Sequence, residues 1–227
     1  MSETKSKCLL FAGPTLVDAN IAAASRRGVQ FMPPVKRGDI DKLTSKRPPG
    51  VVAIVDGLFH QCLSVGHAEI RTAIKLGCEI WGLSSMGAIR AYEMRHMGVR
   101  GFGRVYELFV QFEDFRDDEV ALIHEAAPSY RPLSEPLVHI RFWLKELVNN
   151  GQLTKRQEKR LLDQLMSLWY ADRTLATVRR FVCELVPDQA SEVKRSLSNF
   201  ERYRVKSHDL TDFLHSRPWL TFDDRRS

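Results

Sequence analysis

Apolar and polar positions follow two different periods along the chain, and the change of period divides it into two parts. Up to residue 91, short continuous apolar runs alternate with polar stretches that carry helical spacing. Such runs predict strands that are buried on both faces and joined by crossover helices. From residue 132 onward, apolar residues recur roughly every three to four positions, as in amphipathic helices. The pattern therefore predicts a parallel α/β sheet followed by helices.

The predicted elements define the fold class. The apolar runs indicate strands at residues 8–12, 29–32, 51–55 and 78–81. Helices are expected at residues 15–24, 39–43, 67–76, from 88 onward, 120–127, 137–147, 161–169, 175–185, 193–200 and 210–214. We therefore expect a Rossmann-like parallel sheet of about four strands with flanking helices and an α-helical C-terminal region packed on it. The division is an α/β core over residues 1–127, a helical region over 128–216 and a tail over 217–227.

Composition places the chain among globular proteins. Its 227 residues are 44% hydrophobic, and the longest apolar runs are much shorter than the roughly 18 residues of a membrane-spanning helix. The polar residues 1–7 and the short apolar run behind them do not form a signal peptide, so we expect a cytoplasmic protein. None of the four cysteines forms a Cys-x-x-Cys pair, which indicates neither a zinc ribbon nor a redox motif.

The net charge of +6 permits binding of nucleic acid or of an acidic protein. Lysine and arginine are mixed with acidic residues on the predicted helices, and no basic stripe is interleaved with aromatic residues. An acidic protein partner is therefore favoured over nucleic acid. The basic segment expected to meet that partner contains Lys194, Arg195, Arg202, Arg204 and Lys206.

The stretch over residues 78–91 carries the clearest candidate chemistry. An apolar strand leads through the small residues 82–87 into good helix formers, and Ser84 and Ser85 lie in the turn. A strand, a tight turn and a helix bring backbone N–H groups and the positive end of a helix dipole to one point. A serine there resembles a nucleophile facing an oxyanion hole. The alternative is structural, because small residues let a helix pack closely on a sheet and serines cap helices.

Several polar residues follow the carboxyl ends of the predicted strands. In parallel sheets these ends share one edge, where ligands bind. The His67 side chain joins that edge if its helix starts there, and Arg90 lies one turn into the next helix. The residues expected to gather are Thr15, Lys36, Arg37, Asp39, Asp56, His67, Ser84, Ser85 and Arg90.

Six pieces of the sequence, in order, resemble the TfuA family. They are residues 13–16, 33–39, 54–59, 67–70, 82–91 and 117–121. Together they cover roughly residues 8–127, whereas the C-terminal helices carry no matching motif. Six pieces in order are far more specific than any single one.

The resemblance implies a role in peptide backbone thioamidation beside a YcaO enzyme. TfuA proteins release sulfide from a thiocarboxylated, ThiS-like sulfur-carrier protein through a Ser–Lys pair, and they help YcaO to engage its substrate peptide. The matching positions imply Ser85, or alternatively Ser84, as nucleophile and Lys36 as base. Of the other gathered residues, Thr15, Arg37, Asp39, Asp56, His67 and Arg90 are expected to bind or orient the substrate. No metal or organic cofactor is needed.

Two other function classes remain open. One is a non-catalytic adaptor that bridges YcaO and its substrate peptide, with the serines acting only as a helix cap. The other is a nucleotide-binding α/β protein whose glycine-rich turns hold phosphate. The second is weaker, because neither Gly-x-Gly-x-x-Gly nor a Walker motif is present.

Overall fold

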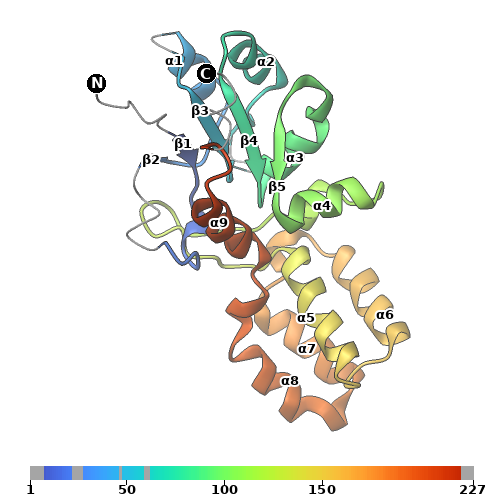
Figure 1. The fold of residues 1–227 in the computed structure, drawn as a ribbon. Coiled ribbons are helices and arrows are strands. Elements are labelled where there is room, and N and C mark those ends of the chain that lie inside the picture. The colour runs from blue at the N-terminus through green and yellow to red at the C-terminus, as the bar shows by residue number, and fades with distance from the viewer. Residues whose placement is uncertain (1–7, 22–27, 46–47, 59–61, 221–227) are drawn as a thin grey trace. The chain divides into compact units, whose positions relative to one another are not determined.

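The chain folds into two compact units. The computed structural model describes residues 8–21, 28–45, 48–58 and 62–220. Unit 1 comprises residues 1–115 together with 206–227, and unit 2 comprises residues 116–205 (Figure 1). The sequence-based division put residues 206–216 with the helical region, whereas the structure groups them with the α/β unit. Unit 1 is therefore discontinuous in sequence.

Unit 1 is built on a parallel sheet, as the apolar runs predict. Its strands lie in the order β2-β1-β3-β4-β5, and every neighbouring pair is parallel. Their bounds are β1 Cys8–Phe11, β2 Val29–Met32, β3 Val51–Ile54, β4 Glu79–Leu83 and β5 Arg100–Phe102. The chain turns outward from β1 in one direction and from β3 in the other, which is the flavodoxin-type doubly wound order.

Strand β5 is absent from the sequence-based prediction. It has only three residues, and its central Gly101 interrupts any apolar pattern. The glycine is required by packing, because a Cβ added there would lie 2.2 Å from the Tyr106 ring. A strand this short has too few positions to show periodicity.

Helices α1 to α4 of unit 1 each follow a strand of the sheet, whereas α9 comes after unit 2 in the sequence. Their bounds are α1 Asp39–Thr44, α2 His67–Lys75, α3 Met86–Glu93, α4 Gly103–Gln111 and α9 Val205–Ser216, of which Val205 belongs to unit 2. The helix expected over residues 15–24 is not formed over 15–21, where only the 3-10 helix Pro14–Leu16 occurs, and residues 22–24 lie outside the described part. The backbone N–H groups of Gly13 and Thr15 bond to a side chain instead of starting an α-helix.

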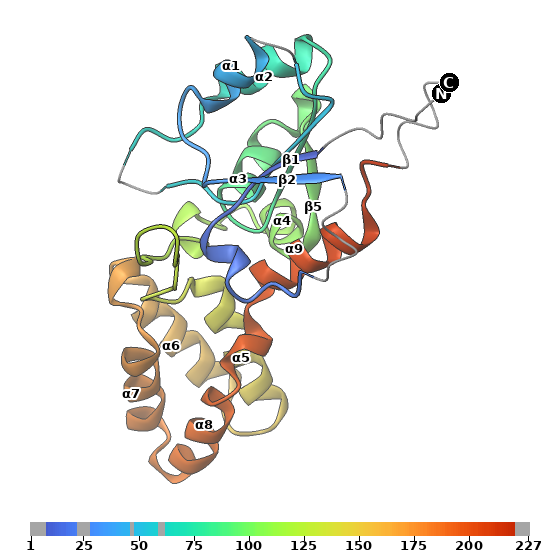
Figure 2. The same cartoon turned by 90° about the vertical axis from the view of Figure 1, so that its left-hand side faces the viewer.

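Helices cover both faces of the sheet. Alternate residues of β3 point to opposite faces, with Val52 and Ile54 in the core under α1, α2 and α3. Val51 and Ala53 lie in the second core, where they meet α9 (Figure 1, Figure 2). Helix α9 contributes Leu210, Phe213 and Leu214 to that core, and all three are fully buried. Helix α9 therefore covers this second face of the sheet, and no α-helix is formed by the described residues directly after β1.

Unit 2 is helical, as the 3.6-residue period predicts. Its helices are α5 Leu137–Asn149, α6 Lys155–Met166, α7 Leu175–Leu185 and α8 Ala190–Leu197. Their apolar stripes form one core around Trp143 and Phe200, whose ring centroids lie 6.2 Å apart. Threonine side chains cap two of the helices: Thr154 accepts from Gln157 N, and Thr174 accepts from Thr177 N.

The prediction of a helix over residues 120–127 is wrong. Asp117–Glu119 forms a 3-10 helix, and His124 pairs with Pro132 in an isolated antiparallel bridge. Long-range ion pairs engage the acidic residues just before this range: Asp118 binds the buried Arg173, and Glu119 binds Arg141. In the described part of the chain, no helix has the length and apolar character needed to cross a membrane.

Candidate active site

The turn between β4 and α3 has the backbone of a sharp strand-to-helix elbow. Strand β4 ends at Leu83, Ser84 adopts a φ of 64°, and Ser85 has φ −133° and ψ −124° before α3 begins. A positive φ is uncommon for a residue other than glycine and is strained. Such strain in a strand–turn–helix junction is a feature of nucleophile elbows.

Two glycines allow α3 to approach the sheet closely. A Cβ added at Gly87 would lie 1.7 Å from the carbonyl oxygen of Ile54, and one added at Gly82 would lie 2.1 Å from the carbonyl oxygen of Gly87. Gly87 N also donates to Val55 O at 3.1 Å. The small residues therefore do serve close helix packing, and that packing fixes the serine turn against β3.

The two serines differ in their surroundings. Ser84 is fully buried and its Oγ donates to Lys206 O at 2.8 Å. Ser85 occupies the N-cap position of α3, but its side chain makes no cap hydrogen bond. Among the described residues, Ser85 Oγ has no hydrogen-bond partner. Of the two serines, Ser85 is therefore the one whose hydroxyl is available to react with a substrate.

The candidate oxyanion donors are the backbone N–H groups of the residues that follow Ser85, Met86 or Gly87. The Gly87 N–H is engaged by Val55 O. The Met86 N–H donates to no other residue within the described chain. One backbone donor at the N-terminus of α3 is therefore available, in line with the helix dipole.

Asp56 holds together the loops that follow β1 and β3. Its carboxylate accepts from Gly13 N at 2.8 Å, from Thr15 N at 3.0 Å and from Thr15 Oγ1 at 2.7 Å. Both Asp56 and Thr15 are buried. These two predicted site residues are brought together at the point where the strand order reverses, where their contacts position the loops.

Lys36, Arg37 and Asp39 form the loop that follows β2. Lys36 N donates to Asp39 Oδ2 at 3.1 Å, and Arg37 Nε donates to Ser64 O at 3.2 Å. The Lys36 and Arg37 side chains are exposed. Within the described chain, Lys36 Nζ makes neither a hydrogen bond nor an ion pair, so it is hydrogen-bonded to neither Ser84 nor Ser85.

The backbone next to Lys36 nevertheless borders the elbow. Val35 pairs with Gly57 in a parallel bridge, and Val35 N donates to Asp56 O at 2.8 Å. A Cβ added at Gly57 would lie 2.9 Å from Met86 Cγ and 3.2 Å from Val35 O. The loops after β2 and β3 and the start of α3 therefore meet at one edge of the sheet.

Glu69 was not recognised from the sequence, although it organises this edge. Its buried carboxylate accepts from Gly38 N at 3.0 Å, from Ile40 N at 3.2 Å and from Gly66 N at 2.7 Å. The local signal is a glutamate at the third position of a helix, which is half of a capping box. The bonds to Gly38 and Ile40 are long-range and leave no mark in the sequence.

His67 and Arg90 meet through a shared carboxylate. His67 Nε2 lies 2.7 Å from Glu93 Oε2, and Arg90 donates to the same oxygen at 2.6 Å. Arg90 Nε also donates to Val65 O at 3.0 Å. Because α2 follows β3 and begins at the carboxyl edge of the sheet, His67 lies on the same edge as Asp56 and Ser85.

A family model matches a large part of the chain. The model for TfuA-like proteins matches residues 56–174, which is more than half of the 227 residues. The chain belongs to the TfuA-like protein family. No curated protein matches it in sequence.

The matched range of this TfuA-like chain contains some of the expected site residues and not others. It includes Asp56, His67, Ser84, Ser85 and Arg90. The four other expected site residues precede it: Thr15, Lys36, Arg37 and Asp39. The match also runs through α5 and α6, so the family extends into unit 2, where the sequence motifs did not reach.

Most of the basic segment expected on this TfuA-like chain is engaged. Arg202 pairs with Glu146 and Arg204 with the buried Glu135. Lys206 is 2% exposed and belongs to unit 1. Only Lys194 and Arg195 of the five are exposed and carry no ion pair to a described residue. These two are therefore the cations of the segment that remain available to an acidic partner, and their role stays a prediction.

No metal centre accompanies the elbow in the described residues. There, no group of three or more histidine, cysteine, aspartate or glutamate side chains is arranged to hold a metal ion. The polar groups at the edge are carboxylates already bonded to backbone N–H groups, exposed cations and the Ser85 hydroxyl. This arrangement suits an anionic substrate and a serine nucleophile.

Proposed function

We propose that this TfuA-like protein hydrolyses a thiocarboxylated, ThiS-like sulfur-carrier protein. The sulfide released would serve YcaO-dependent thioamidation of a peptide backbone, and the protein would help YcaO to engage that peptide. The observation that carries the proposal is the Ser85 hydroxyl, which lies at a strained elbow and has no partner among the described residues. The family match over residues 56–174 supports the thioamidation context.

The reaction balances without a cofactor. Ser85 Oγ attacks the thiocarboxylate carbon and gives its proton to a base. The C–S bond breaks, hydrosulfide leaves, and an acyl-serine remains. Water then cleaves this ester and restores the serine hydroxyl, so that thiocarboxylate and water yield carboxylate and hydrogen sulfide. The Met86 N–H and the N-terminus of α3 would stabilise the oxyanion of each tetrahedral intermediate.

Lys36 is the proposed base. A lysine accepts a proton only in its neutral form, which burial and a neighbouring cation favour. Lys36 is exposed, and Arg37 is next to it in the chain. The docked carrier would therefore have to cover this loop before the pair could act. Arg37 and Arg90 also provide positive charge for the anionic thiocarboxylate.

The test is mass spectrometry of a thiocarboxylated carrier incubated with the protein. Wild type should replace the terminal sulfur by oxygen, and a quenched sample should contain an adduct on Ser85. Ser85→Ala and Lys36→Ala should each lower sulfide release at least a hundredfold, in the range of a lost nucleophile or base. The double variant should lose little more, because the two residues act as a unit.

Lys42→Ala is the matched control, because Lys42 is an exposed lysine in α1 on the same loop–helix segment. It should keep full activity. If Ser84→Ala loses activity while Ser85→Ala keeps it, the assignment between the serines is wrong.

The second candidate is the adaptor without hydrolysis. It is favoured by Lys194 and Arg195 on the helical unit, which are exposed, form no ion pair with a described residue and could bind an acidic partner. If neither serine variant slows sulfide release while both still bind YcaO, the adaptor function replaces the hydrolase.

A further inference from the structure

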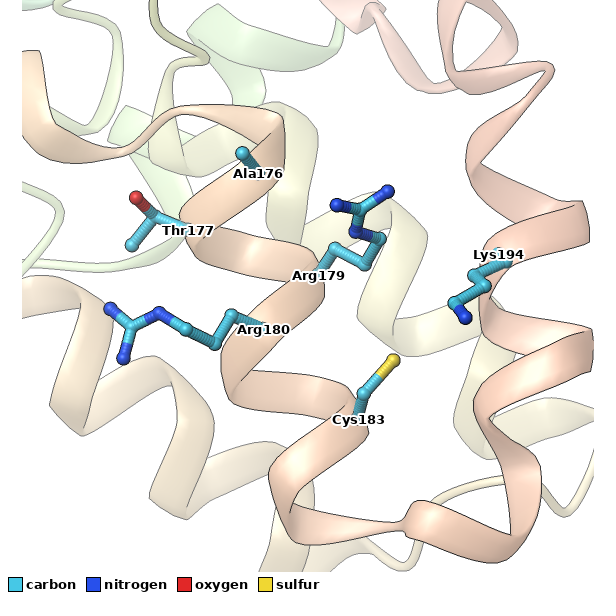
Figure 3. A pocket seen from close by; sticks show the side chains of 6 residues that line it. All are labelled: Ala176, Thr177, Arg179, Arg180, Cys183 and Lys194. Carbon is cyan, nitrogen blue, oxygen red and sulfur yellow. The ribbon is translucent and has the colours of Figure 1, made fainter.

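The helical unit contains a hollow between α7 and α8. The hollow has a volume of about 530 Å³ and is lined by Ala176, Thr177, Arg179, Arg180, Cys183 and Lys194 (Figure 3). A second hollow of about 330 Å³ shares Ala176, Arg179 and Lys194 with the first. Leu175, Leu197 and Ser198 extend its lining. Because the two hollows share these three lining residues, they are together called the α7–α8 groove.

The groove carries positive charge that its own surroundings do not neutralise. Arg179 on α7 and Lys194 on α8 face the gap between the helices (Figure 3), and both are exposed. Neither forms an ion pair with any described residue. Arg180 lies 3.6 Å from Glu184, but both side chains are more than half exposed, so this pair is weak. The lining of both hollows contains no acidic residue.

The groove also has an apolar part. Leu175, Ala176 and Leu197 contribute to its walls, and the half-buried Cys183 points into the gap between Arg179 and Lys194 (Figure 3). An occupant that matches this lining carries carboxylates for the cations and short apolar side chains for the walls. Arginine binds a carboxylate through two parallel hydrogen bonds, which adds geometric specificity.

We propose that the α7–α8 groove binds an acidic segment of a protein partner. Nucleic acid fits less well, because the lining offers no aromatic side chain on which a base could stack. Only one part of this inference rests on the proposed function, namely that the partner is a protein of the thioamidation reaction. The groove does not involve Ser85 or the elbow, which belong to unit 1.

A labelled acidic peptide tests the groove directly. Fluorescence anisotropy would follow a fluorescein-labelled peptide of repeated Glu-Ala-Leu-Glu units as the full chain is added. The wild-type chain should bind it, with affinity that falls as salt is raised. The double variant Arg179→Glu with Lys194→Glu should raise the Kd at least tenfold. The same peptide with glutamine in place of glutamate should not bind.

The matched control is Lys155→Glu with Lys159→Glu. These two exposed lysines lie on α6 of the same unit and do not line the groove, so the net charge changes equally. The control should bind like wild type. Equal loss in both double variants would show diffuse attraction and overturn the proposal. Tighter binding of a single-stranded oligonucleotide, lost in the groove variant alone, would assign the groove to nucleic acid instead.

Cys183 provides a readout inside the groove. Saturating peptide should slow its alkylation by N-ethylmaleimide, whereas the exposed Cys62 of unit 1 should react at an unchanged rate. Unprotected Cys183 under saturating peptide would overturn the assignment. Ser85→Ala should bind the peptide like wild type, so failure of the hydrolase proposal leaves this one standing. Wild-type protein that releases sulfide but does not bind the peptide refutes the groove alone.

Discussion

Ser84 and Ser85 are adjacent, yet the fold assigns them different tasks. Ser84 bears the positive φ and donates to Lys206 O, so its side chain links the elbow to α9. Ser85 has a negative φ of −133° and a hydroxyl without a described partner. Stability and chemistry at the elbow are therefore expected to separate between two neighbouring residues.

This separation can be measured by urea unfolding. Ser84→Ala should lower the free energy of unfolding by about 1 kcal/mol, because a buried hydrogen bond is lost. Ser85→Ala should change it by less than about 0.5 kcal/mol, because no described hydrogen bond is lost. Ser84→Gly is the control for the backbone, since glycine adopts a positive φ without strain. It should be more stable than Ser84→Ala, and equal stability of the two would show that the φ of 64° carries no penalty.

The residues predicted from the sequence to lie at the sheet edge are those that follow a recognisable strand. The serines follow an apolar strand and precede helix formers, and Asp56 follows a buried strand, so their place at the sheet edge was predictable. Glu69 and Lys206 were not, because their contacts at the edge come from residues far away in the chain. The sequence likewise gives no means of telling that Lys206 is buried while Lys36 is exposed.

Among the elements, α4 has an N-terminus that is capped from another helix. Asp209 of α9 accepts from Arg104 N at 2.9 Å and from Val105 N at 3.0 Å. The approach is so close that a Cβ at Gly103 would lie 2.4 Å from Asp209 Cγ. Burial raises the pKa of Asp209 from 3.8 to about 7, and Asp212 adds to this, against the opposing effects of the two N–H groups and Arg104.

Stability is therefore expected to depend on Asp209 in a defined direction. The raised pKa means that the folded chain holds a proton that the unfolded chain has released between about pH 4 and about pH 7. The stabilisation by the proton is thus present at low pH and lost as pH rises through about 7, with a slope of up to about 1.4 kcal/mol per pH unit.

Urea unfolding of wild type and Asp209→Asn at about pH 5 and about pH 8 measures this contribution. The difference in stability, wild type minus variant, should be smaller at the higher pH. Asp163→Asn changes an exposed carboxylate on α6 and should show no such trend. A difference that grows with pH would contradict the direction assigned to Asp209.

Element prediction succeeded where a period extended over several residues. The strands β1 to β4 lie within two residues of the predicted runs, and the helices α5 to α9 overlap the predicted stripes. Two predicted stripe residues lie outside those helices: α6 ends at Met166, before Trp169, and α8 ends at Leu197, before Phe200. The prediction failed for β5, which has three residues, and for residues 120–127, where ion pairs of Asp118 and Glu119 replaced a helix start. The sequence predicts the short apolar stripe of α9, but the stripe alone does not indicate which part of the protein the helix packs against.

The surface that α9 covers matters for the whole molecule, because α9 follows unit 2 in the sequence and completes unit 1. Phe213 is fully buried, and its ring centroid lies 5.6 Å from that of Trp81 and 5.2 Å from that of Phe102. Residues 116–205 form their own core around Trp143 and Phe200. The two units are therefore expected to respond separately to core substitutions.

Hydrogen exchange can test this independence. Phe213→Ala should cost about 3 to 5 kcal/mol and speed amide exchange in β3 and β4, while exchange in α5 and α7 stays unchanged. Phe200→Ala is the matched control in the other core and should give the reverse pattern. Uniformly faster exchange in both units for either variant would show that they unfold as one.

The return of α9 to unit 1 also sets an order of events during protein synthesis. A ribosome completes residues 116–205 before it adds residues 206–216, so the inserted helical bundle is able to fold while the sheet still lacks its last helix. The acceptor of the Ser84 hydroxyl, Lys206 O, emerges late as well. The serine elbow is therefore among the last parts of the nascent chain to mature, and a prematurely terminated chain would carry the bundle without a finished elbow.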